Sequence, residues 1–201
     1  MKRLMMVLCL AASSALASRG YEDRRNAAEL AFSQKSYGEA YRIYSNAVSQ
    51  LELKAADLRW AQFRMADSRW REQAAAAQSD PSKFNEAREA LERLVRDVVR
   101  EEDQDRLWAE VQESLGDSYW RRQDNNWGQA WTYYQRALDW WAGQSDLDTA
   151  RPRYLAIVRV CARPDWVEPW YRYGHFGNQL PFAVLENALT IAQTAEDKAW
   201  A

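Results

Sequence analysis

A pattern of helical spacing occurs three times along this chain of 201 residues, and no other feature of the sequence limits its fold as strongly. The three blocks begin at Tyr37, Phe84 and Trp127, which lie 47 and then 43 residues apart. Aligned without gaps, the blocks agree in five columns: Tyr37, Phe84, Trp127; Ala40, Ala87, Ala130; Tyr44, Leu91, Tyr134; Ala47, Leu94, Ala137; and Val48, Val95, Leu138. The regularity predicts a series of similar structural units.

The spacing inside each block predicts an α-helix. In the first block Ala40 follows Tyr37 by three positions and Tyr44 follows Ala40 by four, which places all three on one helical face. Each block is preceded by a further stretch expected to be helical, over residues 22–34, 57–77 and 103–122. Between residues 21 and 145 there are one Pro and four Gly, and no segment alternates at the period of a strand. The prediction is an all-α fold of antiparallel helical hairpins.

Two short motifs predict where helices begin. Asp80-Pro81 reads as an N-cap followed by proline at the first helical position. The run Asp124-Asn125-Asn126 reads as the turn before a helix that starts near Trp127.

The third unit resembles the tetratricopeptide repeat family most closely. Its motif residues are Leu115-Gly116, Tyr119, Trp127, Ala130, Tyr134 and Ala137-Leu138, and the first unit is similar, with Ala28, Tyr37, Ala40, Tyr44 and Ala47. The second unit departs from the family because Ala66 lies 21 residues before Ala87, so residues 74–81 look like an insertion between its helices. The resemblance covers about residues 22–142. It implies a short right-handed solenoid whose hairpins span residues 18–142.

In such an array the first helices of the hairpins line a concave face suited to a peptide or a partner helix. Polar residues on the expected first helices are therefore candidates for binding a protein or peptide partner. They are Arg59, Gln62, Arg64, Arg69, Glu113, Asp117 and Arg121.

Residues 143–201 are expected to form a degenerate fourth hairpin, with helices over 148–161 and 181–194. Between these helices, residues 163–180 are rich in large rings and in chain-breaking Pro and Gly. This segment either caps the open end of the array or forms a ligand-binding loop. Its candidate binding residues are Trp166, Trp170, Tyr173 and His175.

The first 17 residues have the three parts of a secretory signal peptide. A basic start at Lys2-Arg3 precedes an apolar run, and Ala15-Leu16-Ala17 offers small residues for cleavage. The mature chain is therefore expected in the periplasm or the extracellular space, without a membrane span. Cleavage removes Cys9 and leaves Cys161, which cannot form a disulfide within the chain and is expected to be a buried apolar residue.

The composition offers little for catalysis or for cofactor binding. The chain has one His and two Cys, and it contains no phosphate-binding loop or dinucleotide-binding glycine pattern. We therefore predict no catalytic residue, cofactor or metal. The net charge is −2, with basic residues interspersed among acidic ones, which excludes an extended nucleic-acid-binding surface.

Three functional hypotheses remain at this point. The first is a non-catalytic interaction or scaffold module outside the cytoplasm. The second is the N-terminal helical region of a larger secreted protein, because residues 173–178, 185–189 and 196–199 resemble helical regions of bacterial alpha-2-macroglobulin-like proteins, although that family's Cys-x-Glu-Gln thioester motif is absent. The third is a free-standing enzyme that uses Cys161 with His175, or the acidic pairs near Glu101.

Overall fold

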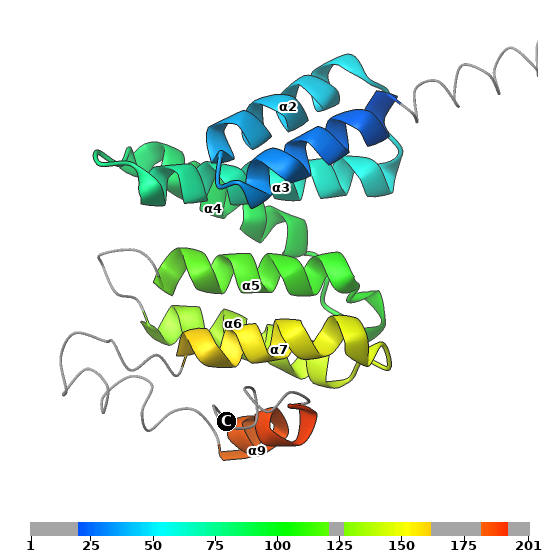
Figure 1. Cartoon of the computed structure of the whole chain (residues 1–201), viewed down its shortest axis with the longest axis vertical. Helices are drawn as coiled ribbons and strands as arrows, with labels where there is room; N and C mark the ends of the chain where they lie inside the picture. Colours follow the sequence, from blue (N-terminus) through cyan, green and yellow to red (C-terminus); the bar gives the residue numbers. More distant parts are fainter. Residues whose placement is uncertain (1–19, 121–126, 162–181, 193–201) are drawn as a thin grey trace, which may run out of the picture. The chain divides into compact units, whose positions relative to one another are not determined.

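The computed structural model describes residues 20–120, 127–161 and 182–192, and every regular element in these ranges is helical (Figure 1). The elements are a helix over residues 20–33, α2 (Tyr37–Gln50), α3 (Ala55–Ala75), α4 (Pro81–Val95), the short 3-10 helix η1 (Glu101–Asp103), α5 (Arg106–Trp120), α6 (Trp127–Ala142), α7 (Leu147–Cys161) and α9 (Phe182–Ile191). The all-α prediction is confirmed, and the expected helices lie within a few residues of the observed ones. No helix among the described residues combines the length and the apolar character needed to cross a bilayer.

The chain divides into two compact units, Met1–Val99 and Arg100–Ala201. In the first unit α2 packs on α3 and α3 packs on α4. In the second unit α5 packs on α6, α6 on α7, and α7 on α9. The division falls inside residues 18–142, which the sequence grouped as one array.

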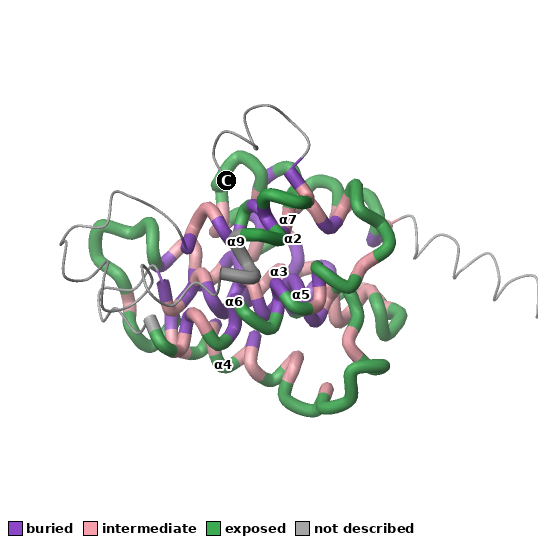
Figure 2. The backbone as a smooth tube through the Cα atoms, turned by 90° about the horizontal axis from the view of Figure 1, so that it is seen from below, coloured by how far each residue is buried: buried purple, intermediate pink, exposed green. Residues whose placement is uncertain are grey.

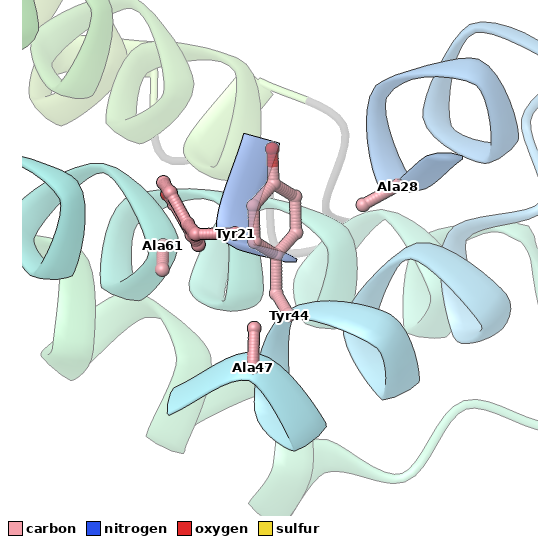
Figure 3. Packing of buried hydrophobic residues seen from close by; sticks show 5 residues of the cluster. All are labelled: Tyr21, Ala28, Tyr44, Ala47 and Ala61. Carbon is pink, nitrogen blue, oxygen red and sulfur yellow. The ribbon is translucent and has the colours of Figure 1, made fainter. Parts of the chain in front are cut away.

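The core of the first unit forms where the helix over residues 20–33 meets α2 and α3. Figure 3 shows the Tyr44 ring among Tyr21, Ala28, Ala47 and Ala61, and all five residues are buried. The Tyr21 hydroxyl donates a hydrogen bond to the carbonyl oxygen of Asp57 (3.0 Å), the third residue of α3. Small side chains around Tyr44 therefore leave room for a large ring at the centre of this unit.

Two of the five aligned columns are buried in all three blocks. Ala40, Ala87 and Ala130 are buried, and so are Tyr44, Leu91 and Tyr134. In the second unit the Tyr134 ring packs directly on the backbone of α5, because a Cβ atom added at Gly116 would lie 2.6 Å from Tyr134 Cδ1. Glycine at this position is what permits the close approach of the ring.

Burial differs between α3 and the block that follows it, because α3 buries seven residues and α4 buries three. Figure 2 marks the buried positions in purple, and α5 buries ten of its 15 residues. In the first block the preceding helix buries Tyr21, Ala28 and Ala31, and α2 also buries three residues.

The predicted start of α4 is confirmed. Asp80 is the N-cap, its Oδ1 accepts hydrogen bonds from the backbone N–H groups of Ser82 (3.0 Å) and Lys83 (3.4 Å), and Pro81 is the first helical residue. The Asp80 N–H donates to Oε1 of buried Gln73 (2.8 Å), which fixes the connection between α3 and α4. The turn predicted at residues 124–126 lies outside the described residues, but α6 begins at Trp127 as expected.

Candidate functional site

An acidic residue follows a small residue at the same place in three helices. Glu29 follows Ala28, Asp67 follows Ala66 and Asp117 follows Gly116. In the first unit the Tyr44 hydroxyl donates to Oε1 of Glu29 (2.5 Å), and in the second unit the Tyr134 hydroxyl donates to Oδ1 of Asp117 (2.7 Å).

The second block has Leu91 in the tyrosine column, which cannot donate a hydrogen bond. Asp67 instead accepts a hydrogen bond from Trp70 Nε1 (3.0 Å). Each of the three acids thus has an aromatic donor close by. The recurrence of these acids is visible in the sequence, but the hydrogen bonds that they accept are seen only in the structure.

Arg64 of α3 joins two of these acids in the first unit. Its Nε donates to Oε1 of Glu29 (2.8 Å), its Nη2 pairs with Glu29 Oε2, and its Nη1 contacts Asp67 Oδ2 (3.2 Å). Its guanidinium also lies 3.7 Å from the ring centroid of Phe32, and its side chain is only 12% exposed. Arg64, a candidate for binding a partner, is therefore engaged inside the unit.

The charge state of Glu29 follows from these contacts. Burial alone raises the pKa of this carboxyl, but the hydrogen bond and charge of Arg64, with further donors from Tyr44 and Trp60, outweigh burial and hold the pKa below its ordinary value. Glu29 is therefore ionised at neutral pH.

The second unit has a related cluster with a different balance of charge. Glu113 Oε1 accepts hydrogen bonds from Trp141 Nε1 (2.5 Å) and Arg153 Nε (3.1 Å), and Nη2 of Arg153 lies 3.0 Å from Oε2 of Glu113. The same Nη2 is 3.7 Å from Oε2 of Glu110, whose other oxygen pairs with Arg106 (2.8 Å).

Burial dominates at Glu113 and raises its pKa to about 7. The charge of Arg153 and the Trp141 hydrogen bond act in the opposite direction, while the neighbouring carboxylates of Asp117 and Glu110 add to the rise. Glu113 therefore changes charge close to neutral pH, and it lies inside the second unit together with Asp117.

A hollow of the first unit is lined by residues of α2, α3 and α4, and we call it the α2–α4 groove. Its volume is about 490 Å³. It is lined by Tyr41 of α2, by Gln62, Met65, Ala66 and Arg69 of α3, and by Glu86, Ala87, Ala90, Arg93 and Leu94 of α4. Gln62 and Arg69 are among the binding candidates that the sequence predicts.

Met65 and Ala66 lie on α3 beside the predicted residues but are not polar, and the candidates were chosen among polar residues. The other lining residues lie on α2 and α4, which the sequence assigned to packing rather than to binding. Only the arrangement of α2, α3 and α4 brings the ten residues together.

The polar groups of the groove differ in how firmly they are held. The Arg69 guanidinium lies 4.9 Å from the centroid of the Tyr41 ring and pairs with Glu72 at 3.2 Å. Arg93 contacts Glu89 only at 3.9 Å, and both side chains are more than half exposed. Gln62 and Glu86 are exposed. The groove therefore combines an apolar floor with polar groups available along its rim.

A second hollow of about 570 Å³ lies in the second unit, between η1 and α6. Its lining includes Glu101, Glu102, Trp108, Asp139 and Trp140, and the Trp140 Nε1 donates to the carbonyl oxygen of Gln104 (3.2 Å). Burial raises the pKa of Asp139. Glu101, Glu102 and Asp139 are exposed to solvent.

The other predicted binding residues fall into two groups. Arg59 is half-buried on α3 and already has an interaction partner. The remaining candidates, Arg121, Trp166, Trp170, Tyr173 and His175, lie outside the described residues.

The expected burial of Cys161 is confirmed. Burial, assisted by the charge of Asp117, raises the pKa of the thiol far above its usual range, so Cys161 is a poor nucleophile. Within residues 20–120, 127–161 and 182–192, no three His, Cys, Asp or Glu side chains are placed to hold a metal ion.

Comparison with known proteins gives no relative. No protein-family model matches the sequence, and the searches of curated proteins and of solved structures return no significant match.

Proposed function

We propose that this chain is a non-catalytic protein-interaction module built from tetratricopeptide-like helical hairpins. The observation that carries the proposal is the α2–α4 groove, because it places predicted binding residues, Gln62 and Arg69, above an apolar floor of Met65, Ala66 and Ala87. Sites with a few polar groups around an apolar surface are typical of protein recognition. The partner is accordingly a protein or a peptide.

The proposed architecture is a short right-handed solenoid. It is supported by the burial of two aligned columns in all three blocks and by the recurring acid after a small residue, from Glu29 through Asp67 to Asp117. Stacked helical pairs of this kind leave grooves between neighbouring helices, which suit binding better than they suit covalent chemistry.

Export through residues 1–17 is the second part of the proposal. The support is the basic, apolar and small-residue order of this segment, which lies outside the described residues. Edman sequencing of the protein from the exported fraction should begin at Ser18. Recovery of the full chain from the cytoplasm alone would contradict export.

Site-specific photo-crosslinking tests the groove as a binding surface. A photoreactive residue placed at Gln62 should give a covalent adduct with a partner in the exported fraction, because Gln62 lines the groove and is exposed. Gln50 is the matched control, since it is an exposed glutamine at the end of α2 that does not line the groove.

A second variant separates binding from folding. Ala90→Trp fills the groove and should remove the adduct at Gln62, whereas Ala27→Trp, at an exposed position of the helix over residues 20–33, should leave it unchanged. Circular dichroism confirms that both variants fold. Equal adducts at Gln62 and Gln50, or an adduct that survives Ala90→Trp in a folded protein, would rule out this groove.

A further inference from the structure

We infer that the occupant of the α2–α4 groove is an amphipathic α-helix of a partner protein, with one basic and one acidic residue about two turns apart beside its apolar face. This inference rests on the proposed function and names the class of its partner. It is argued from the floor of the groove, from its hydrogen-bonding capacity and from the charges on α4.

The small side chains in the floor of the groove leave room for an α-helix to pack on it. Ala66 of α3 and Ala87 and Ala90 of α4 all line the groove, and each contributes a single methyl group. Small side chains let the surface of an approaching helix come close to the two helices beneath it. Tyr41 and Leu94 also line the groove and supply further apolar contact.

The hydrogen-bonding capacity of the groove favours a helix over an extended peptide. Its elements are α-helices, whose backbone groups are paired within each helix, and the exposed Gln62 amide is the main neutral polar side chain in the lining apart from the Tyr41 hydroxyl. An extended peptide would leave most of its own N–H and C=O groups without partners above the alanine floor. A helix satisfies its backbone internally and needs only side-chain contacts.

The charges on α4 define which helix fits. Glu86 and Arg93 both line the groove and are seven residues apart, so they stand about 10 Å apart along the helix axis. No cation of the described residues pairs with Glu86, and Arg93 is held only by the 3.9 Å contact with Glu89. Arg69, in contrast, is already held by Glu72 and Tyr41. A base opposite Glu86 and an acid opposite Arg93 therefore complement the groove.

Binding of designed peptides to the full chain tests this inference. Three fluorescein-labelled, end-capped 18-residue helices share one alanine and leucine face and carry, two turns apart, Lys and Glu, Lys and Lys, or Glu and Glu. The wild-type chain should bind the Lys–Glu helix about threefold to tenfold more tightly than the other two, as expected for exposed ion pairs. Fluorescence anisotropy measures each dissociation constant.

Protein variants should change this preference in a defined way. Glu86→Arg places a cation at both charged positions of α4 in the groove and should favour the Glu–Glu helix, while Arg93→Glu should favour the Lys–Lys helix. Glu52→Arg, at an exposed position outside the groove, is the control and should keep the wild-type order. These preferences do not depend on the direction in which the peptide lies.

A fourth peptide, the Lys–Glu helix with a central proline, tests helicity because proline breaks a helix interior. It should lose at least tenfold in affinity. The inference is overturned if the proline peptide binds as well as its parent, if the variants do not alter the order, or if no peptide saturates below about 1 mM. A Gln62 adduct obtained despite such a failure would preserve the proposed function and exclude only the helical partner.

Discussion

Each of the two units pairs a carboxylate with an arginine, yet the pKa values of the two carboxylates are shifted in opposite directions. Glu29 in the first unit is held ionised, with its pKa below the usual range, whereas the pKa of Glu113 in the second unit is raised to about 7. Both accept a hydrogen bond from an indole N–H group and both pair with an arginine. The presence of an ion pair therefore does not decide the charge of a buried acid.

The difference lies in how completely water is excluded from each carboxyl and in the charged groups that act on it. Arg64 makes two contacts with Glu29, which also accepts from the Tyr44 hydroxyl. Arg153 lies between Glu113 and Glu110, and Asp117 adds a further negative charge nearby. The Glu113 side chain is 16% exposed and that of Glu29 is 32% exposed. Deeper burial and more acidic neighbours together raise the pKa in the second unit.

Removal of Arg64 should have the largest effect on stability. Arg64→Met leaves Glu29 and Asp67 without the cation that joins them, and breaking a buried pair in this way costs about 3–5 kcal/mol in the free energy of unfolding. Hydrogen exchange of amides in α3 measures the loss within the first unit. Arg42→Met breaks the exposed pair with Glu39 and should change little. Comparable exchange in the two variants would show that the Arg64 network is not structural.

The next largest effect is expected in the pH dependence of the stability of the second unit. The pKa of Glu113 is raised on folding from 4.5 to about 7, so its contribution favours the folded state at acidic pH and falls as pH rises between these values, by an amount on the order of 3 kcal/mol. Glu29 acts in the opposite sense, because its pKa is lowered and its stabilisation is lost only as pH falls below its ordinary value.

The thiol of Cys161 reports this response because it is buried at the end of α7. In the chain that begins at Ser18, labelling relative to the unfolded chain should be slower at pH 5.5 than at pH 8. Glu113→Gln should make the two protection factors similar, and Glu102→Gln, at an exposed site, should not. A pH dependence that persists unchanged in Glu113→Gln would assign it to another group.

Exchanging Gly and Ala at the matching positions 116 and 28 tests how the two units differ in packing around their central tyrosines. Gly116→Ala places a methyl group 2.6 Å from the Tyr134 ring and should destabilise the second unit by about 1–2 kcal/mol, after allowance for the better helix propensity of alanine. Ala28→Gly should cost about 1 kcal/mol in the first unit. Urea denaturation followed by circular dichroism measures both.

A double variant identifies the cause of the Gly116→Ala effect. The second block combines Ala66 with Leu91, so Tyr134→Leu in the Gly116→Ala background should remove part of the clash. The double variant should therefore lose less stability than the two single losses together. Strict additivity would show that the Tyr134 ring is not the obstacle.

The smallest effect is expected at the helix N-caps, where the units are alike. Asp80 accepts from two backbone N–H groups at the start of α4, and Asp105 accepts from the Trp108 N–H (2.8 Å) at the start of α5. Asp80→Ala and Asp105→Ala should each lower stability by less than the changes above and by similar amounts, because capping does not depend on the buried acids. Thermal unfolding compares the two, and a much larger loss in one unit would reveal a second role for that aspartate.

Much of the fold could be predicted because helix formation depends on local periodicity. The spacing of Tyr37, Ala40 and Tyr44 gave the first block its helix, and Asp80-Pro81 marked a helix start to the residue. The burial of Cys161 followed from its place after Ile157 and Val158 on the same helix. Each of these inferences needs only residues that are near neighbours in the chain.

The candidate site was harder to predict because it depends on which helices lie side by side. Gln62 and Arg64 are two positions apart and looked equally suited to a partner, yet Gln62 lines the groove and Arg64 is paired with Glu29. Arg64 takes its role from Glu29, which lies 35 positions earlier in the chain. Glu113 likewise owes its raised pKa mainly to burial, with Asp117 and Glu110 of its own helix adding to the rise, and the spacing along α5 does not reveal how deeply Glu113 is buried.

The pairing of an earlier acid with a later arginine gives each contact a direction along the chain, because Arg64 reaches back to Glu29 and Arg153 reaches back to Glu113. Loss of either helix of such a pair would leave the other charge without its partner inside the unit. A charge change in one helix is therefore expected to be tolerated best when the paired helix changes with it.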